Sequence, residues 1–537
     1  METMEFDFVI VGAGSAGCVL ANRLTADGQY RVALLEAGGR DSNPWIHIPV
    51  GYFRTMDNPR TDWRYRTAPD HGLNGRSIPW PRGKVLGGSS SINGLLYVRG
   101  QAEDYDHWRQ LGNEGWSWND VLPYFRRAES WQGPRHGTDD VRGRQGPLVV
   151  SPSGVRREIV DLWIEAAVTA GYCRNLDYNE GDQEGVGYVQ QTAARGRRCS
   201  TAVAYLRPAR KRRNLEIFVK ALVERLVFVD GRVSGLTVVS RDRRFDITAR
   251  REVVLCAGAI GSPQILMLSG VGEGEELQRF GIEVRRELAG VGRNLQDHLQ
   301  ARPVFRTDLS TVNVEADNIF RQARVALRYL LTRDGPMSMA ASLGTGFLKT
   351  DSGLATPDIQ FHVQPFSADS LTKGTHRFSA FTSSVTQLRP ESRGEIRLRT
   401  SSIHDHPDIC PNYLATDNDC RTIVEGIRIA RRISRCEPLK SRVTGEHAPG
   451  EDVPLDDDEA TLEWARNTAT TIYHPSGTCK MGRDPMAVVD PRLRVHGVGG
   501  LRVADASIMP TLVSGNTNAP AIMIGEKASA MILEDAR

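Results

Sequence analysis

The 537-residue sequence predicts an α/β fold made of two interleaved parts. An apolar run ends at Val11, a glycine-rich turn and a helical stretch over 15–25 follow, and a second apolar run covers 30–36. This strand–helix–strand order is typical of a parallel nucleotide-binding sheet, so we expect a Rossmann-like part. Residues 302–446 differ in composition and carry alternating runs such as 394–399, which favour an α+β part built on a mostly antiparallel sheet.

The order of the segments implies that both parts are discontinuous. Further strand-like runs occur at 216–219, 226–229, 233–239 and 251–256. We therefore expect the nucleotide-binding part to contain residues 1–150, 195–301 and 462–537. The second part, which we expect to bind the substrate, then contains residues 151–194 and 302–461.

Composition excludes several classes of protein. The chain has 68 basic and 65 acidic side chains, and this near-neutral balance argues against nucleic-acid binding. Eight cysteines without a CxxC pattern fit reduced thiols, and no basic, cleavable leader precedes the first strand, so we expect a cytoplasmic protein. The uncharged stretches 253–272 and 506–525 are interrupted by glycine, proline and polar residues. We expect no membrane span, and nothing in the sequence supports a peripheral membrane contact.

The first motif is the turn after the first strand. Gly12, Gly14 and Gly17 have the GxGxxG spacing, and Glu36 ends the next strand. In this context the glycines allow a tight turn, the approach of a pyrophosphate to a helix N-terminus, and close packing of helix on strand. Glu36 is placed to accept hydrogen bonds from an adenosine ribose. The motif predicts a dinucleotide site but does not separate FAD from NAD.

Four more segments are dense in glycine, hydroxyl and amide residues. They cover residues 80–94, 258–272, 473–482 and 503–520. Together with the first motif they resemble the glucose-methanol-choline (GMC) family of FAD-dependent oxidoreductases, and the resemblance runs over about 6–531. Segments 80–94 and 258–272 resemble the two signature patterns of that family without a gap.

The resemblance implies an extended FAD between the GxGxxG turn, the first signature loop and the C-terminal motifs. Some members of the family attach flavin through a histidine in this loop, and the matching residue here is Ile92, so we expect FAD to be bound noncovalently. The cofactor candidates are Gly12, Gly14, Ser15, Gly17, Glu36, Ala37, Arg82, Val85, Gly87, Ser89, Asn93, Gly94, Val223, Tyr473, Asp505, Ala506, Asn516 and Thr517.

The resemblance also implies alcohol oxidation, in which a base removes the hydroxyl proton while hydride passes to flavin N5. His474 occupies the position of the family's catalytic histidine, and histidine titrates near neutral pH. The family's partner residue is a histidine or an asparagine, and we expect Asn518 in that role. Asp297 and His298 resemble a family loop near the cofactor, for which a structural role is expected.

The expected substrate is a neutral primary alcohol, aliphatic or aromatic. Leu343 matches the position where choline-specific members carry an acid, and a buried cation without a counter-charge is costly. His362 and Tyr473 are further substrate candidates. Choline dehydrogenation and a lyase of the hydroxynitrile type remain alternatives, and a nicotinamide-dependent dehydrogenase would not explain the flavin motifs.

The sequence leaves the electron acceptor open between dioxygen, a quinone and another carrier. We expect no metal site, because His404 and His406 flank Asp405 without a third ligand at a recognisable spacing. The basic run 207–213 is expected to be a solvated face.

Overall fold

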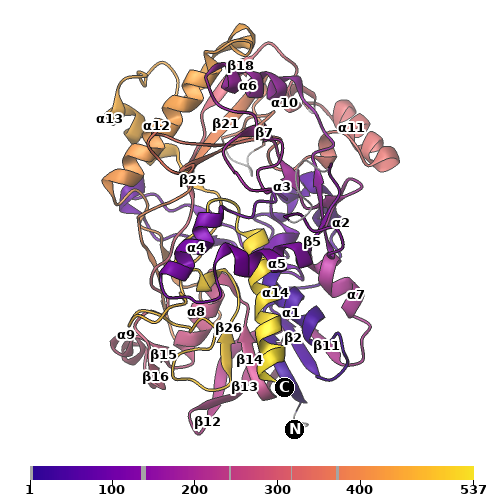
Figure 1. Ribbon diagram of the computed structural model, residues 1–537, viewed down its shortest axis with the longest axis vertical. Helices are drawn as coiled ribbons and strands as arrows, with labels where there is room; N and C mark the ends of the chain where they lie inside the picture. The colour runs from indigo at the N-terminus through magenta and orange to yellow at the C-terminus, as the bar shows by residue number, and fades with distance from the viewer. Residues whose placement is uncertain (1–3, 135–140, 241–242, 316, 370–373) are drawn as a thin grey trace.

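The computed structural model contains two large sheets that follow one another along the long axis of the molecule (Figure 1). The structure describes residues 4–134, 141–240, 243–315, 317–369 and 374–537. The C-terminus lies beside the lower sheet in Figure 1, and β1 at the start of the described residues belongs to that sheet.

The first sheet has seven strands and a parallel centre. β1 (Met4–Val11) lies between β2 (Val32–Glu36) and β14 (Arg243–Leu255), parallel to both, and β26 (Leu501–Val503) lies parallel to β14. β11 (Leu215–Val219) extends one edge in parallel, while β12 (Leu222–Val229) and β13 (Arg232–Ser240) extend the other as an antiparallel meander. The carboxyl ends of the parallel strands meet at one edge, which is where such sheets bind ligands.

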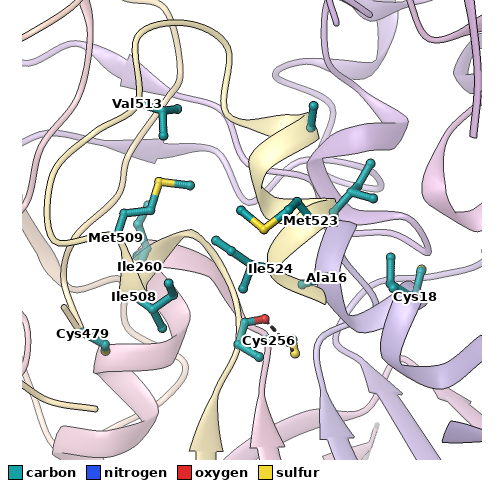
Figure 2. Packing of buried hydrophobic residues seen from close by; sticks show 14 of the residues in the cluster. Ala16, Cys18, Cys256, Ile260, Cys479, Ile508, Met509, Val513, Met523 and Ile524 are labelled. Carbon is teal, nitrogen blue, oxygen red and sulfur yellow. Dashed lines mark hydrogen bonds between the residues drawn. The ribbon is translucent and has the colours of Figure 1, made fainter. Parts of the chain in front are cut away.

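Helices close the faces of this sheet. α1 (Ser15–Leu24) packs against α14 (Asn518–Asp535), which also contacts α5 (Trp118–Ala128). Gly525 makes the contact with α1 close, because a Cβ there would lie 2.9 Å from the carbonyl oxygen of Ala16. Figure 2 shows Met523 and Ile524 of α14 beside Ala16, facing Ile260 of α8 (Gly258–Leu268). This apolar packing fixes the N-termini of α1 and α14 beside the sheet edge.

The second sheet confirms the expected antiparallel part, since all of its strand pairs are antiparallel. α6 and α12 pack on it. The elements are β7 (Gly185–Tyr188), β17 (Leu299–Ala301), β18 (Val304–Thr307), β19 (Gly344–Leu348), β20 (Ile359–Gln364), β21 (Ala380–Gln387), β24 (Val443–Ala448), β25 (Thr470–Thr471), α6 (Glu158–Thr169) and α12 (Asp417–Ser434).

Two details differ from expectation. β17 and β25 lie in ranges assigned to the nucleotide-binding part, yet they pair with one another and β17 pairs with β21. The alternating run 394–399 contributes only β22 (Glu395–Arg397), which pairs with β23 (Asp408–Cys410) in a separate ribbon. The alternating pattern predicted a strand but not the strand with which it pairs. A strand buries one face in a two-stranded ribbon as it does in a larger sheet, so the pattern is the same in both.

The remaining elements are short or peripheral. None of the helices among the described residues is long and apolar enough to cross a membrane. All eight cysteines are unpaired, as expected. The other elements are α2 (Pro44–His47), η1 (Pro49–Gly51), α3 (Tyr52–Thr55), β3 (Tyr65–Arg66), β4 (Pro79–Trp80), η3 (Gly88–Ser91), α4 (Ala102–Gln110), β5 (Glu129–Trp131), β6 (Leu148–Pro152), β8 (Gln190–Gln191), β9 (Ala193–Ala194), β10 (Arg197–Arg198), α7 (Arg207–Ala209), β15 (Val271–Gly272), α9 (Gly274–Arg279), β16 (Arg286–Glu287), α10 (Val312–Glu315), α11 (Ile319–Thr332), η5 (Pro336–Ser338) and α13 (Asp458–Thr468).

Candidate active site

A single cavity collects most of the predicted site residues, and it runs from the carboxyl edge of the first sheet to the second sheet. Among the cofactor candidates, three do not line it: Gly17, Val85 and Gly87. Those that do are Gly12, Gly14, Ser15, Glu36, Ala37, Arg82, Ser89, Asn93, Gly94, Val223, Tyr473, Asp505, Ala506, Asn516 and Thr517. Residue 257 and residues 258–261 at the start of the second signature segment also line it, although none of them was among the cofactor candidates.

The GxGxxG turn has the geometry that its spacing predicts. Gly12 has a φ of +100°, and a Cβ on Gly17 would lie 1.9 Å from the carbonyl oxygen of Gly12. Gly17 therefore acts by packing the helix on the turn, not by contacting the cavity. Glu36 accepts hydrogen bonds from the backbone N–H groups of Ala13 at 3.1 Å and Gly38 at 2.8 Å, and burial raises its pKa to about 7.

The first signature loop lies directly on this turn. The N–H of Gly87 donates to the carbonyl of Ala13 at 2.7 Å, and Gly87 has a φ of +89°. A Cβ on Gly88 would lie 2.7 Å from Cα of Gly14. Val85 is fully buried beneath the loop, so it and Gly87 shape the cavity wall from behind. Ile92, at the position of the family's flavin-linking histidine, lines the cavity with an aliphatic side chain.

His474 is held at the other end of the cavity by three contacts. Its backbone N–H donates to Oδ1 of Asp297 at 2.6 Å. Its ring is nearly buried, with Nδ1 2.9 Å from Nδ1 of His298 and Nε2 3.0 Å from Nδ2 of Asn516. The ring is therefore fixed at both nitrogens, and the Nε2 side lies with Asn516 in the cavity lining.

The proton positions on these rings follow from one carbonyl group. His298 Nε2 lies 3.0 Å from the carbonyl oxygen of Leu388, which can only accept, so His298 carries its proton on Nε2. In its neutral form His298 then accepts at Nδ1, and His474 must donate from its own Nδ1. His474 Nε2 then carries the lone pair, which accepts a hydrogen bond from the Asn516 amide.

Burial keeps both rings neutral. It lowers the pKa of His298 to about 4 and, with contributions from His298, His362 and Arg82, lowers the pKa of His474 well below its usual value. Burial also raises the pKa of Asp297 to about 6, although this carboxyl accepts hydrogen bonds from the hydroxyls of Thr471 and Tyr413.

The prediction that Asn518 is the partner of His474 was wrong. The asparagine that contacts His474 lies two positions earlier in the chain. Asn518 is the first residue of α14, and its Oδ1 accepts a hydrogen bond from Ser15 Oγ at 2.8 Å, so it faces the GxGxxG turn. Asn516 precedes the helix and contacts His474 instead, while Gln360 Nε2 lies 3.4 Å from its Oδ1. The chain turns between the two asparagines, and a two-residue step in a turn points side chains in different directions.

Of the substrate candidates, His362 and Tyr473 line the cavity but Leu343 does not. Leu343 is fully buried, and its N–H donates to Val363 in the second sheet, so Ala341 and Ser342 take the cavity side. The expectation for Leu343 was wrong because a one-residue shift along an extended segment reverses the face that a side chain occupies.

The second sheet also supplies polar side chains that we did not predict. Gln300 and Arg302 line the cavity at alternate positions after His298, and Gln364 lines it two residues after His362. Arg302 donates from Nη2 to Gln364 Oε1 at 3.4 Å, and its buried Nε has no hydrogen-bond partner among the described residues. Side chains two residues apart on a strand lie on the same face of the sheet. Only the fold shows that this face lines the cavity.

The described residues group three possible metal ligands away from this cavity. Asp369, His376 and His447 each offer one ligand atom, and these atoms lie within 4.8 Å of one another. His376 already contacts Asp369 through Nε2 and Ser367 through Nδ1, both at 2.9 Å. We assign no metal to this group, and His404 and His406 are not part of it.

The chain is similar to known proteins over nearly its whole length. Models of the GMC oxidoreductase family match residues 6–300 and 390–525. Alcohol dehydrogenase [acceptor] of Pseudomonas putida is 40% identical over 531 residues, which cover 98% of this chain and 96% of that protein. Mitochondrial choline dehydrogenase of Homo sapiens is 42% identical over 537 residues, covering 98% and 90%. The crystal structure of pyridoxine 4-oxidase from Mesorbium loti has a TM-score of 0.88 at 31% identity and covers 98% of this chain and 99% of that one.

Proposed function

Since the chain belongs to the GMC oxidoreductase family and is an FAD-dependent oxidoreductase of CH–OH groups, we propose that it oxidises a neutral primary alcohol to the aldehyde with His474 as the base. The observation that carries this proposal is the lone pair on His474 Nε2, which the His298–Leu388 contacts leave unprotonated beside the Asn516 amide. Burial keeps the ring neutral and so ready to accept a proton.

The cavity fits FAD at both ends. The adenosine end has Gly12 and Gly88, where backbone approaches backbone too closely for a side chain, and Glu36 at the end of β2. Asp505 accepts from the N–H of Gly258 at 2.8 Å and from Ser262, which fixes the strand ends beside the cavity. When bound, FAD supplies the hydride acceptor. We propose that it is bound noncovalently, because Ile92 offers no nucleophile.

The side chains around His474 suggest how the alcohol is held. An alcohol that displaces the Asn516 amide from His474 Nε2 would give up its hydroxyl proton to the ring, and its oxygen would accept the hydrogen bond of the amide in place of the ring nitrogen. Asp297 and His298 do not line the cavity and would act on the alcohol only through His474, so they are positioning residues. We propose Asn516, in place of Asn518, as the partner of the base.

The charge of the cavity supports a neutral substrate over choline. Arg302 lines it beside Tyr473, and arginine stays charged in proteins although burial lowers the pKa of this one. A quaternary ammonium substrate would meet this cation in a poorly hydrated space, which is unfavourable. The argument stands without Leu343, which lies outside the cavity.

Rapid mixing with alcohol in the absence of oxygen tests the proposal. The flavin absorbance should bleach, and His474→Ala should slow bleaching at least about a hundredfold while retaining FAD. His404→Ala, which changes an exposed histidine, is the matched control. Bleaching at the normal rate in His474→Ala would refute the base, and absence of bleaching with every alcohol would favour a lyase that does not reduce its flavin.

The proposal also covers how FAD is attached, which molecule accepts the electrons and where the protein is located. Acid or heat denaturation should release the yellow chromophore into solution, and flavin retained on the polypeptide would contradict noncovalent binding. We leave the electron acceptor open between dioxygen, a quinone and another carrier, and peroxide production measured against dye reduction would distinguish them. A cytoplasmic location is supported by the eight unpaired cysteines.

A further inference from the structure

Helix α11 presents an unusual amount of apolar surface to solvent. Of its fourteen residues only Tyr329 is buried. Five large apolar side chains have exposed fractions between 57% and 84%: Ile319, Phe320, Leu327, Leu330 and Leu331. Isolated exposed leucines are common, but a contiguous group on one helix marks an interaction surface.

The positions of these residues divide the helix into three sectors. At about 100° per residue, the exposed apolar side chains fall within a sector of roughly 120°. Tyr329 points to the protein, where its hydroxyl donates to the carbonyl of Gly196 at 2.8 Å. A sector next to the apolar one, along its edge farther from Tyr329, carries Arg321, Arg324 and Arg328. We call the five apolar residues and these three arginines the α11 face.

The surface beside α11 also carries aromatic and basic side chains. α11 lies at the margin of the molecule in Figure 1, and η5 connects it to η1 and so to α2 and α3. On α2, Trp45 is 38% exposed, and the Arg54 guanidinium lies 5.8 Å from its ring centre. The turn between β9 and β10, which carries Gly196, exposes Arg195 and Arg197. Aromatic and basic side chains therefore extend beyond the helix.

We propose that the α11 face docks on the surface of a bilayer that contains anionic phospholipids. The apolar sector would enter the boundary between headgroups and acyl chains, and the arginines would contact the phosphates. A helix of this length does not span a bilayer, so the contact is peripheral. The separation of apolar and basic sectors on one short helix is the pattern of interfacial helices.

Charge complementarity favours lipid over a second copy of the chain. The arginines lie on one side of the apolar sector only, so an antiparallel pair of α11 helices about a two-fold axis would bring the arginines of both copies together. An anionic membrane would cover the apolar sector and offer phosphates to the arginines, of which Arg321 and Arg328 also pair with Asp317 and Asp334 at the exposed surface. The chain carries four arginines and two aspartates over 317–334, which leaves this segment basic.

Vesicle flotation with the FAD-loaded enzyme tests the proposal. The wild-type protein should float with phosphatidylcholine vesicles that contain phosphatidylglycerol, bind at least about tenfold less to phosphatidylcholine alone, and lose binding as salt rises. The triple variant Phe320→Glu, Leu327→Glu and Leu331→Glu should lose flotation. The variant Arg324→Gln with Arg328→Gln should keep weak binding but lose its preference for phosphatidylglycerol.

Two controls keep the outcome clear. Val229→Glu changes a side chain that is 55% exposed, close to the 57% of Leu327, at the far end of the molecule on β12. It should float like the wild type. All variants should retain FAD and normal turnover with a soluble dye, because the α11 face lies outside the cavity lining. Equal flotation of wild type and triple variant, or no flotation at all, would overturn the proposal, as would a dimer that dissociates in the triple variant without any vesicle binding.

Discussion

The Nδ1 atom of His298 lies 2.9 Å from the Nδ1 atom of His474, and only one placement of protons satisfies both neutral rings. The carbonyl of Leu388 requires a proton on His298 Nε2, which makes His298 the acceptor and His474 the donor. The carbonyl of Leu388, the residue after β21, thus determines which nitrogen of the base carries its lone pair on the cavity side, as hydrogen bonds to the other ring nitrogen do for other functional histidines.

Replacing His298 should therefore impair the base without removing it. In His298→Ala, His474 loses the acceptor at Nδ1 and is free to change tautomer, so anaerobic flavin reduction should slow roughly ten- to a hundredfold. The kinetic pKa should rise, because His298 is one of the groups that lower the pKa of His474. A stopped-flow pH profile measures both effects. His298→Asn keeps an acceptor near the same place and should recover most of the rate, and an unchanged profile in His298→Ala would remove the positioning role.

The two asparagines should have separable effects. Asn516→Ala removes the amide beside His474 Nε2, and we expect flavin reduction to slow about a hundredfold with FAD content unchanged. Asn518→Ala removes the acceptor for Ser15 at the GxGxxG turn, so it should weaken FAD retention and leave the reduction rate of the loaded enzyme near normal. Equilibrium dialysis and stopped-flow absorbance distinguish the two. The opposite pattern would restore Asn518 as the partner.

The sequence predicted the local elements of this fold well but not the contacts between distant ones. The turn at Gly12 and the helix after it depend on short-range glycine chemistry, and both occur where expected. The His298–His474 contact joins residues 176 positions apart, and no spacing pattern reports such a pair. Leu343 was misplaced because one residue of register separates the cavity side of an extended segment from its buried side. The structure was needed to identify contacts between residues of different chain segments.

Acid should destabilise the protein through His298. The unfolded side chain titrates near pH 6.5, whereas burial lowers the folded pKa to about 4, so between these values the unfolded state binds more protons. Stability from this group is complete above about pH 6.5 and falls as the pH decreases toward 4, by up to about 3 kcal/mol. The measurement is the free energy of unfolding of wild type minus that of His298→Asn.

This difference should shrink with decreasing pH over that interval. The subtraction is needed because Asp297, whose pKa burial raises to about 6, contributes with the opposite sign over an overlapping range. A difference that stays constant from pH 7 to 4 would mean that His298 titrates normally in the folded protein.

The charge at Arg302 should influence substrate choice. Arg302→Gln keeps hydrogen-bonding capacity near Gln364 but removes the cation, so kcat/KM for choline should rise relative to that for benzyl alcohol by about tenfold. The wild type should prefer benzyl alcohol or hexanol. Arg399→Gln, which alters an exposed arginine outside the cavity, serves as the control. Choline as the best substrate of the wild type would contradict the neutral-alcohol proposal.

Gly88 tests whether the two glycine loops must touch. Its φ of +52° is one that an L-residue can adopt at modest cost, but a Cβ would lie 2.7 Å from Cα of Gly14, where only backbone could move to relieve the clash. Gly88→Ala should separate the loops and weaken FAD binding at least about tenfold. Gly28→Ala also places a side chain at positive φ, here +81°, but with nothing within 4 Å, so it isolates the cost of backbone strain. If the two variants lose FAD equally, as judged by titration of the apoprotein, the close contact between the loops has no role in binding the cofactor.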